Sequence, residues 1–456
     1  MKHWNTNRMI MLCLVGVMVI SLNPRGVRAA EFFVATTGND SNSGTIGSPF
    51  LTLEKAANVM ASGDTMFIRG GTYRRTAQYL DVPSGGGSWA TATTVQAYKN
   101  EEVIITPQDP TEKGTDVILL PNNKSYIIFD GLILDGLRSG LRNGGDGGFY
   151  FDRAYDYSNP SHHIRLINLE IRNTYSNAIL TRNATHNEFI NLNLHHADHN
   201  NPAYGYSQGP YGIYMASGNN LMMGCDVHHN GAYGIHHYSN HPPPHVPDNN
   251  IYIGNTVHDN GRSGFRIGGK NTNVTLINNL AYRNGWGPKV NRYGFHVEGG
   301  ISNVLLYNNT SYGNVEGELL LRVGTLPVTI KNNIFFGVSD NAFTVFLDGS
   351  SGAVLDYNAI YHPHESFRIR NQGSATISNT IYKDPLFVNA KNADFHLQPG
   401  SPAIGKGVVL NEVKIDYDNV QRNLEGPFDI GAYSFSGSSL PSVSERPASP
   451  RNVQVY

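Results

Sequence analysis

Short runs of alternating apolar residues recur along most of the chain, separated by Asn, Gly and Asp. Ile251 and Ile253, and then Phe265 and Ile267, show the pattern, in which every second residue is apolar. This period of two predicts strands rather than helices, because successive side chains of a strand point to opposite faces. The Asn- and Gly-rich positions between the runs predict tight turns. We therefore expect an all-β protein.

One phrase returns along the chain: apolar residues, an Asn, two further residues, and then a His or an aromatic residue. The His-or-aromatic column is His195, His228, His258, Tyr282, Tyr312, Phe336, Tyr361 and Tyr382. Three residues earlier lies a second column, Asn255, Asn279, Asn309, Asn333, Asn358 and Asn379. Columns of this kind indicate that the body of the chain is built from repeating units.

The repeat length favours one solenoid architecture. The units are 21 to 33 residues long, which suits a right-handed parallel β-helix whose coils each contribute three strands and stack about 4.8 Å apart. A leucine-rich repeat is disfavoured because no LxxLxLxxN phrase occurs, and a propeller because its blades need about 40–50 residues. The predicted fold is a right-handed parallel β-helix.

Composition agrees with this fold and excludes some functions. Charged residues make up only 15% of the chain, against about 25% in typical domains. A stacked Asn column explains how a polar interior is tolerated, since each amide can bond to the Asn above and below. The net charge of -2 gives no basic footprint for nucleic acid.

The N-terminus predicts secretion. Lys2 and Arg8 precede an apolar run over residues 9–22, which is too short for a comfortable membrane span, and Val27-Arg28-Ala29 fits a cleavage site. We interpret residues 1–29 as a signal peptide, with an uncleaved anchor as the alternative. No membrane association is expected after cleavage, and the protein is expected to be extracellular or periplasmic.

The rest of the chain divides into a β-helix domain and a tail. The domain covers residues 31–435, with an N-terminal cap and first coil at 31–75, regular coils at 160–385 and closing strands at 386–435. Ala56, Ala57 and Met60 predict a short helix across the open end of the cap. Residues 436–456 are rich in Ser and Pro and form the tail. An end-capped solenoid of this kind is expected to be a monomer.

Two segments resemble a known group of proteins. FFVATTGNDSNSGTIGSPFLTLEKAANVMASGDTMFIRGGTY, residues 32–73, resembles the opening cap of secreted pectate-lyase-like β-helix proteins, and DFHLQPGSPAIGKG (394–407) resembles their closing motif. The resemblance covers about residues 31–435 and implies the fold and an extracellular polysaccharide partner. That superfamily contains lyases, hydrolases, epimerases and binding proteins, so the reaction stays open.

A second phrase, Gly-apolar-x-apolar-x, predicts the strand that carries the chemistry. Its inward column is Ile213, Ile235, Phe265, Phe295, Leu319, Phe343 and Phe367. The outward column one residue later is Tyr214, His236, Arg266, His296, Leu320, Thr344 and Arg368. Two residues further lie Tyr238, Glu298, Arg322 and Arg370. Stacking would bring these side chains into one row on the outside of the coil.

Insertions predict a groove along this row. They occupy residues 201–211, 239–249 and 285–293. The aromatic residues expected on its rim, suited to stack on sugar rings, are Tyr204, Tyr206, Tyr211, Trp286 and Tyr293.

The row suits β-elimination of a uronate polymer. Arg266 would neutralise the substrate carboxylate, His236 or His296 would remove the C5 proton, and Tyr214 or Tyr238 would protonate the leaving oxygen. Tyr238, Glu298, Arg322, Tyr211, Trp286 and Tyr293 are the candidate substrate-binding residues. Hydrolysis needs two carboxylates, and the row offers only Glu298. A non-catalytic glycan-binding or surface module, or a hydrolase or epimerase, remains an alternative.

No metal ligand is assigned, and calcium is left open. GFRIGG (264–269) resembles a motif of one pectate lyase family whose Lys is the base, but Arg266 stands in that position. The calcium-binding Asp cluster of that family is not evident, because only Asp198 and Asp226 lie on the preceding coils. His195, His228 and His258 share their column with aromatic residues, which favours a structural stack over a metal site. Cys225 occupies the Asn column and is expected to be buried and inert.

Overall fold

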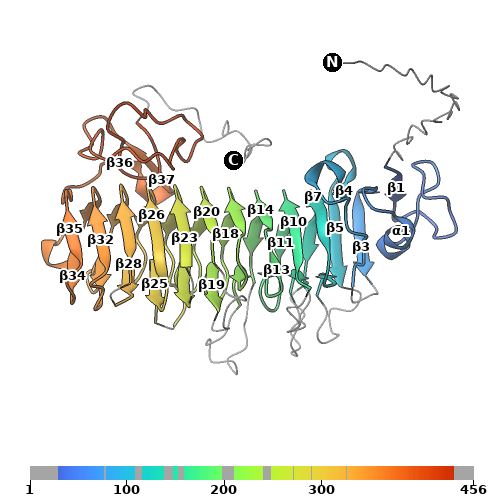
Figure 1. Ribbon diagram of the computed structural model, residues 1–456, viewed down its shortest axis with the longest axis horizontal. Helices are drawn as coiled ribbons and strands as arrows, with labels where there is room; N and C mark the ends of the chain where they lie inside the picture. The colour runs from blue at the N-terminus through green and yellow to red at the C-terminus, as the bar shows by residue number, and fades with distance from the viewer. Residues whose placement is uncertain are drawn as a thin grey trace, which may run out of the picture.

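The computed structural model describes residues 29–75, 79–107, 116–137, 147–151, 159–197, 210–239, 248–270, 272–288, 290–324 and 326–435. In these residues the chain winds into stacked coils, and the strands form three long parallel sheets (Figure 1). The predicted parallel β-helix is confirmed. No helix in the described part of the chain is long and apolar enough to cross a membrane.

Sheet 1 has the strands β1 (Glu31–Val34), β2 (Thr65–Ile68), β4 (Thr93–Ala97), β7 (Ser125–Asp130), β10 (Ser161–Ile167), β14 (Glu188–Ile190), β17 (Leu221–Met223), β20 (Ile251–Ile253), β23 (Thr272–Ile277), β26 (Ser302–Tyr307), β29 (Val328–Lys331), β32 (Ala353–Asp356) and β35 (Thr376–Ser378), with β13 (Ala184–Thr185) beside β10.

Sheet 2 has the strands β3 (Gly71–Arg75), β5 (Val103–Pro107), β8 (Ile133–Asp135), β11 (Glu170–Arg172), β15 (Asn193–His195), β18 (Asp226–His228), β21 (Thr256–His258), β24 (Leu280–Tyr282), β27 (Thr310–Tyr312), β30 (Ile334–Phe336) and β33 (Ala359–Tyr361). Sheet 3 has the strands β6 (Ile118–Leu120), β9 (Phe149–Phe151), β12 (Ile179–Leu180), β16 (Ile213–Met215), β19 (Ile235–Ser239), β22 (Phe265–Gly269), β25 (Tyr293–Gly299), β28 (Gly317–Arg322), β31 (Val345–Leu347) and β34 (Ile369–Asn371).

The predicted capping helix is α1 (Leu53–Val59). The side chain of Thr52 caps its N-terminus by accepting a hydrogen bond from the amide of Lys55, and Leu53, Ala56 and Ala57 are buried. These residues belong to the same apolar core as the first coils. The helix therefore shields the end of the core from water, where an open coil would otherwise expose it.

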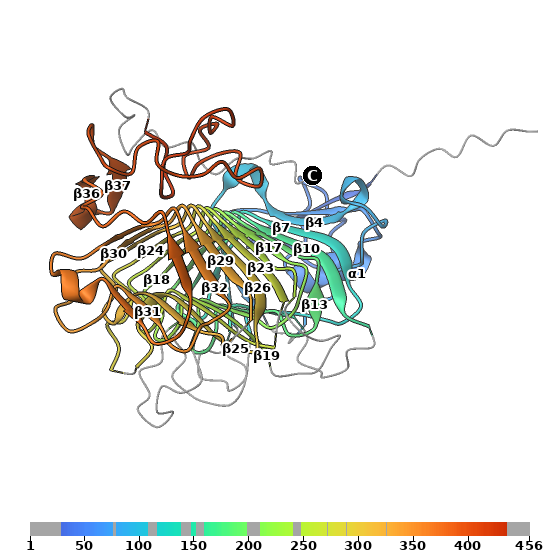
Figure 2. The same ribbon diagram turned by 60° about the vertical axis from the view of Figure 1, so that its left-hand side comes forward.

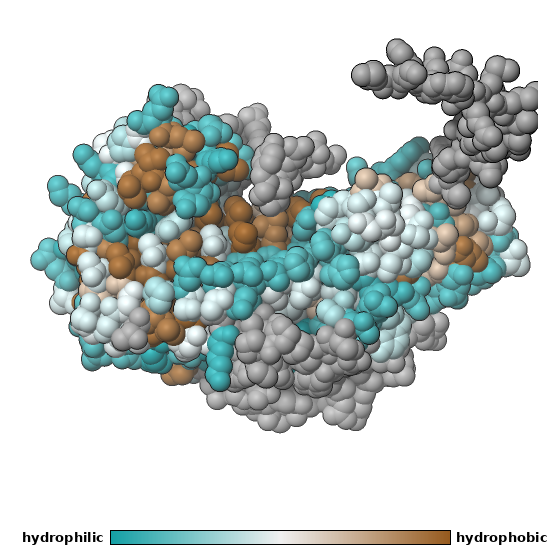
Figure 3. Space-filling model, viewed as in Figure 1, coloured by the Kyte–Doolittle hydropathy of each residue, from teal (hydrophilic) through white to brown (hydrophobic). Residues whose placement is uncertain are grey.

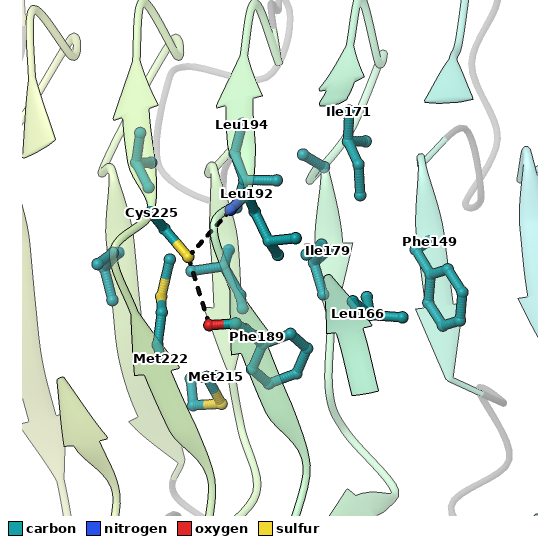
Figure 4. Close-up of a cluster of buried hydrophobic side chains, with 14 of the residues drawn as sticks. Phe149, Leu166, Ile171, Ile179, Phe189, Leu192, Leu194, Met215, Met222 and Cys225 are labelled. Atoms are coloured by element: carbon teal, nitrogen blue, oxygen red, sulfur yellow. Dashed lines mark hydrogen bonds between the residues drawn. The ribbon is translucent and has the colours of Figure 1, made fainter. Parts of the chain in front are cut away.

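The core is apolar and includes the lone described cysteine. Figure 4 shows Cys225 among Phe189, Leu192, Met222 and their neighbours. Its thiol contacts the backbone amide of Leu192 and the carbonyl of Phe189, each at 3.4 Å. Burial raises the pKa of this thiol to about 12, so it is protonated and unreactive, as the sequence predicts.

The Asn column forms a buried hydrogen-bonded ladder. From Asn255 to Asn358, each amide Nδ2 donates to the Oδ1 of the next Asn at 2.9–3.0 Å. The ladder starts one coil earlier, where the backbone amide of Cys225 donates to Asn255. The prediction that Asn379 belongs to this Asn column is wrong. Thr380 follows Asn358 in register, because Ala359 pairs with Ile381, and Asn379 instead bonds to Asp356 on the outside.

The predicted aromatic column exists from His195 to Tyr361, which pair in register, but Tyr382 was wrongly assigned to it, because Ala359 pairs with Ile381 and Tyr382 is level with Ile360. The rings of His195, His228, His258 and Tyr282 are parallel within 16°, with centroids 4.7–5.0 Å apart. These rings stand on the outside of sheet 2 at the ends of β15, β18, β21 and β24.

The segment after the last coil folds back rather than stacking on the end of the coils. It contains two short antiparallel strands, β36 (Phe387–Asn389) and β37 (Asp394–Leu397), followed by irregular chain to residue 435. It lies along one side of the coils (Figures 1 and 2), where Phe387 and Phe395 pack against residues of sheet 2. Hydrophobic residues gather in and beside this segment (Figure 3). The predicted tail at 436–456 and the predicted signal peptide at 1–29 lie outside the described residues, apart from Ala29.

Candidate functional site

The predicted row of polar side chains lies on the outer face of sheet 3. The row is Tyr214, His236, Arg266, His296 and Leu320, which pair in register on β16, β19, β22, β25 and β28. Beside it runs a second row, Tyr238, Gly268, Glu298 and Arg322. Inward-facing Ile213, Ile235, Phe265, Phe295 and Leu319 are fully buried, so the alternation predicted for these coils is correct.

The register predicted for the last two coils is wrong by two residues. Leu319 pairs with Val345, which pairs with Ile369, in place of the predicted Phe343 and Phe367. The outward positions are therefore Phe346 and Arg370, not Thr344 and Arg368. A shift of two leaves the same faces inside and outside, so alternation alone does not distinguish the two registers.

Glu298 is the hub of a charged network on sheet 3. Arg266 donates from Nη2 to its Oε1, while His296 donates from Nε2 to its Oε2 at 2.9 Å. The more exposed Arg322 reaches the same oxygen from Nη1 at 3.2 Å. The hydrogen bond from His296, together with the charge of Arg266, lowers the pKa of Glu298 to about 2 although its partial burial acts in the opposite direction. Glu298 is therefore ionised in any physiological medium.

His296 and Arg266 support this carboxylate from beneath. The side chain of His296 is fully buried, and burial lowers its pKa to about 4 in spite of the bond to Glu298. Arg266 is 6% exposed and also donates to the carbonyl of Ile267 at 3.1 Å. Gly268 makes room for it, since a Cβ there would lie 2.0 Å from Nη1 of Arg266. Both side chains are thus directed at Glu298 rather than at solvent.

A pocket of about 540 Å³ opens above this network. Its lining consists of Tyr238, Arg266, Gly269, Lys270, Glu298, Gly299, Gly300 and Arg322. Arg322, whose side chain is 50% exposed, is oriented by Asp348, which accepts from its Nε at 2.7 Å. Lys270 is exposed at the end of β22. The pocket therefore presents two accessible cations over one ionised carboxylate.

His236 lies next to the pocket in an aromatic cluster. Its ring stacks on Tyr214 at 4.8 Å and on Tyr238 at 5.4 Å, and meets the edge of Tyr211 at 4.4 Å. Its Nδ1 atom is buried without a hydrogen-bond partner. Burial, and then the charge of Arg266, hold the pKa of His236 well below its usual range. The ring is therefore a neutral imidazole at neutral pH.

The predicted rim aromatics have different environments. Tyr211 is buried beside Tyr233 and Tyr214, so the prediction that it is a rim residue is wrong. Tyr293 is half-buried against His296. Trp286 is 58% exposed and donates to the carbonyl of Asp259 at 2.8 Å, and neither ring lines the pocket. Tyr204 and Tyr206 lie outside the described residues.

No calcium cage is apparent in the part of the chain that the structure describes. There, no group of three or more His, Cys, Asp or Glu side chains is arranged to hold a metal ion. Asp226 lies on sheet 2, where it reaches His258 at 3.1 Å, and is not next to the site on sheet 3. Asp198 lies outside the described residues.

Sequence reasoning missed Lys270 and Asp348. Lys270 follows the Gly268-Gly269 pair, beyond the alternating phrase. Asp348 follows β31, whose register was predicted two residues out. The pairing of Leu321 with Leu347 brings Asp348 level with Arg322, and alternation alone does not reveal this register.

Comparison with known proteins agrees with the fold. A family model described as the Pel9A-like, right-handed β-helix region matches residues 32–315. A pectate lyase, PEL9, from Emericella nidulans is 35% identical over 79 residues, which is 17% of this chain and 19% of that protein. The chain thus matches about a fifth of that relative's length.

Solved structures show the same fold at low sequence identity. The crystal structure of pectate lyase Pel9A superposes with a TM-score of 0.57 at 16% identity, over 90% of this chain and 98% of that one. PfbA, a surface adhesin of Streptococcus pneumoniae, gives a TM-score of 0.54 at 14% identity, over 72% of this chain and 84% of that one. An enzyme and an adhesin share this architecture, so the fold alone does not decide between catalysis and binding.

Proposed function

The chain belongs to the family of Pel9A-like right-handed β-helix regions, and on that premise we propose that it is a secreted polysaccharide lyase that cleaves a uronate-containing glycan by β-elimination. The observation that carries the proposal is the sheet 3 pocket, with Lys270 and Arg322 exposed over the ionised Glu298 network. An extracellular polysaccharide is the partner, and the protein acts as a monomer.

Substrate binding rests on the two accessible cations. The C6 carboxylate of a uronate ring would pair with Arg322, whose planar guanidinium suits bidentate binding, and with Lys270. Arg266 was the sequence candidate for this role, but its guanidinium is already committed to Glu298. We assign Arg266 and His296 to positioning Glu298. Neutralising the substrate carboxylate makes the C5 proton more acidic, which is the first requirement for elimination.

The reaction needs a base and a route for the leaving oxygen. His236 is neutral at neutral pH and is the sequence candidate that remains closest to the pocket without a charged partner. It would take the C5 proton, and the electron pair would form the C4–C5 double bond as the bond to O4 breaks. The hydroxyl of Tyr238 or water would protonate O4. Tyr214 stacks on His236 and holds its ring.

Hydrolysis is less well supported by the same geometry. A hydrolase needs one protonated and one ionised carboxyl group across the scissile bond. Glu298 is the pocket's carboxylate, and its pKa of about 2 leaves it unable to donate a proton near neutrality.

Glycan binding without turnover is the second candidate. One observation favours it: His296 is sealed from solvent and His236 nearly so, which leaves little acid–base machinery in direct reach of a ligand. The pocket and its cations would then serve adhesion to an anionic polysaccharide.

One assay distinguishes these functions. The protein is incubated with pectate, alginate, glucuronan and glycosaminoglycan, each with and without chelator. We expect one uronate polymer to yield a product with the ultraviolet absorbance of an unsaturated uronate. The variant His236→Ala should lose this product while still binding the polymer. New reducing ends without that absorbance would indicate hydrolysis, and binding without any product would indicate adhesion.

A further inference from the structure

Charges alternate from coil to coil along the outer face of sheet 3. Five strands, β22, β25, β28, β31 and β34, are successive neighbours in this sheet. In that order they carry Lys270, Glu298, Arg322, Asp348 and Arg370, with Lys270 and Asp348 just after the strand ends. The series starts in the pocket and ends at Arg370, which is not part of the pocket lining.

Arg370 is an accessible cation without a carboxylate partner. It is exposed, and it pairs in register with the outward-facing Phe346 of the preceding coil. In the part of the chain that the structure describes, no ion pair involves Arg370, whereas Asp348 pairs with Arg322 and Glu365 pairs with Arg368. The positive charge of Arg370 is therefore available to a ligand.

The guanidinium of Arg370 is held in place by uncharged neighbours. Its carbon Cζ lies 5.1 Å from the ring centroid of Phe346 and 5.5 Å from that of Phe343. The amide oxygen of Gln372, turned toward the guanidinium, accepts from Nε at 3.1 Å and from Nη2 at 2.6 Å. These contacts restrict the side chain before a ligand arrives, so less conformational entropy is lost on binding.

The contact with Gln372 leaves one edge of the guanidinium open. A guanidinium has five N–H donors, and Gln372 takes one from Nε and one from Nη2. The edge formed by Nη1 and the second hydrogen of Nη2 stays available. Two parallel donors of this kind match the two oxygens of a carboxylate.

From this arrangement we propose that Arg370 forms a second uronate subsite, which binds the carboxylate two sugars away from the one held in the pocket. This inference rests on the proposed function, because it takes an anionic polysaccharide as the ligand. It adds that the glycan lies along the coil axis, from the pocket toward the last coil.

The spacing of the two arginines fits this placement. Arg322 and Arg370 stand two coils apart, which is about 10 Å along the axis and close to the length of a disaccharide. In an extended glycan whose successive sugars are turned over, the carboxylates of every second sugar face the same side. Such a chain would present one carboxylate to Arg322 and the next on that side to Arg370.

Asp348 makes the intervening position selective. Its side chain is 33% exposed, and Arg322 bonds to its Oδ2 at 2.7 Å. A carboxylate facing Asp348 would be repelled, whereas the hydroxyl groups of a sugar can donate to its oxygens. The face therefore favours a glycan that turns alternate carboxylates away over one that presents a carboxylate at every coil.

The test measures how affinity and rate depend on substrate length. Oligomers of pectate, alginate and glucuronan of defined length are compared, with kcat/KM for the active protein and calorimetry in the His236→Ala background. Once an oligomer gains the two sugars that reach Arg370, both quantities should rise about tenfold. Arg370→Ala should lose this rise, and Arg370→Lys, which keeps the charge but not the two parallel donors, should keep only part of it.

Arg283→Ala is the matched control, because it removes an exposed arginine outside sheet 3, and it should leave the rise unchanged. An equal loss in Arg283→Ala would mean general charge attraction and would overturn the subsite. So would an unchanged rise in Arg370→Ala, while product from the same protein would leave the lyase proposal standing. Loss of the rise in affinity in a protein that forms no product would support the subsite and contradict the lyase proposal. Unchanged melting temperatures of the Arg370 variants would show that the last coil is intact.

Discussion

Two glutamates on neighbouring strands of sheet 3 have opposite charge states. Glu298 on β25 is bonded to Arg266, His296 and Arg322 and has a pKa of about 2. Glu318 on β28 is fully buried, and burial raises its pKa to about 8 although the hydroxyl of Ser311 and the amide of Asn314 both donate to it. The same side chain is thus ionised in one place and protonated in the other.

The difference teaches what polar groups do in this solenoid. Glu318 ends a second buried Asn ladder, in which Asn230, Asn260, Asn284 and Asn314 bond in sequence at 2.9–3.0 Å. It accepts from the last amide at 2.5 Å, so its role is to close a structural network with neutral partners. Glu298 is surrounded by cations at the floor of a pocket, where a charge is kept available to a ligand.

The largest effect should come from removing the ionisable group at Glu318. Because its folded pKa of about 8 lies above the ordinary 4.5, its contribution to stability is full below pH 4.5 and is lost as pH rises to 8. Glu318→Gln should therefore match the wild type near pH 4 and exceed its unfolding free energy by on the order of 4 kcal/mol above pH 8. Denaturant titrations at several pH values measure this. A variant that is equally destabilised at all pH values would show that Glu318 is not protonated.

The first Asn ladder should be nearly as sensitive. Asn309 accepts from Asn279 and donates to Asn333, at 2.9 Å in each case. Asn309→Ala leaves the buried amides of Asn279 and Asn333, on two neighbouring coils, without their hydrogen-bond partner. We therefore expect a loss of about 3 kcal/mol in unfolding free energy. The control is Asn303→Gly, which removes an exposed Asn with φ of 53° and should cost less than about 1 kcal/mol. Equal costs would contradict a structural role for the buried ladder.

Glu298→Gln should change stability in the direction opposite to Glu318→Gln. Its folded pKa of about 2 lies below 4.5, so its stabilisation is present above pH 4.5 and is lost as pH falls toward 2. At neutral pH we expect a loss of about 2 kcal/mol, discounted for its partial exposure. Denaturation at pH 7 and pH 3 should show the gap to the wild type narrowing with acid. If the difference in unfolding free energy between variant and wild type does not change with pH, the ionised Glu298 network does not account for the stability.

The smallest stability change should come from Arg322→Ala. Half of this side chain is exposed, and its ion pairs with Glu298 and Asp348 lie at the surface. Exposed pairs contribute about 0–1 kcal/mol, so the melting temperature should scarcely move. A large drop would show that Arg322 holds the fold together and does not serve a ligand.

The sequence predicted the features of the fold that follow from the alternation of apolar residues and from the stacking of coils. The columns of Asn255, His258 and Phe265 locate coils, strands and faces, because each coil repeats the same environment. It did not predict the ladder through Asn260, since the Asn-Gly turns also read as ordinary turn signals. The register of Val345 was missed because a shift of two residues keeps the same faces inside.

The candidate site was predictable in its location but not in its chemistry. Arg266, His296 and Glu298 were placed on one face by counting residues. The side-chain conformations in the stacked coils decide which of these residues is buried and which is exposed to solvent. The alternating pattern carries no information on these conformations. Arg266 therefore looked like a ligand for substrate, whereas its guanidinium lies against Glu298.

The most direct test of the sheet 3 site compares two matched arginines. Arg322 is 50% exposed and pairs with Glu298 and Asp348, while Arg283, which follows β24 of sheet 2, is 44% exposed and pairs with Asp259. The rate of unsaturated-product formation from the best uronate polymer is measured for the wild type, Arg322→Ala and Arg283→Ala. The pocket account predicts that Arg322→Ala loses most of the activity and that Arg283→Ala keeps it. Equal activity in the two variants would contradict it.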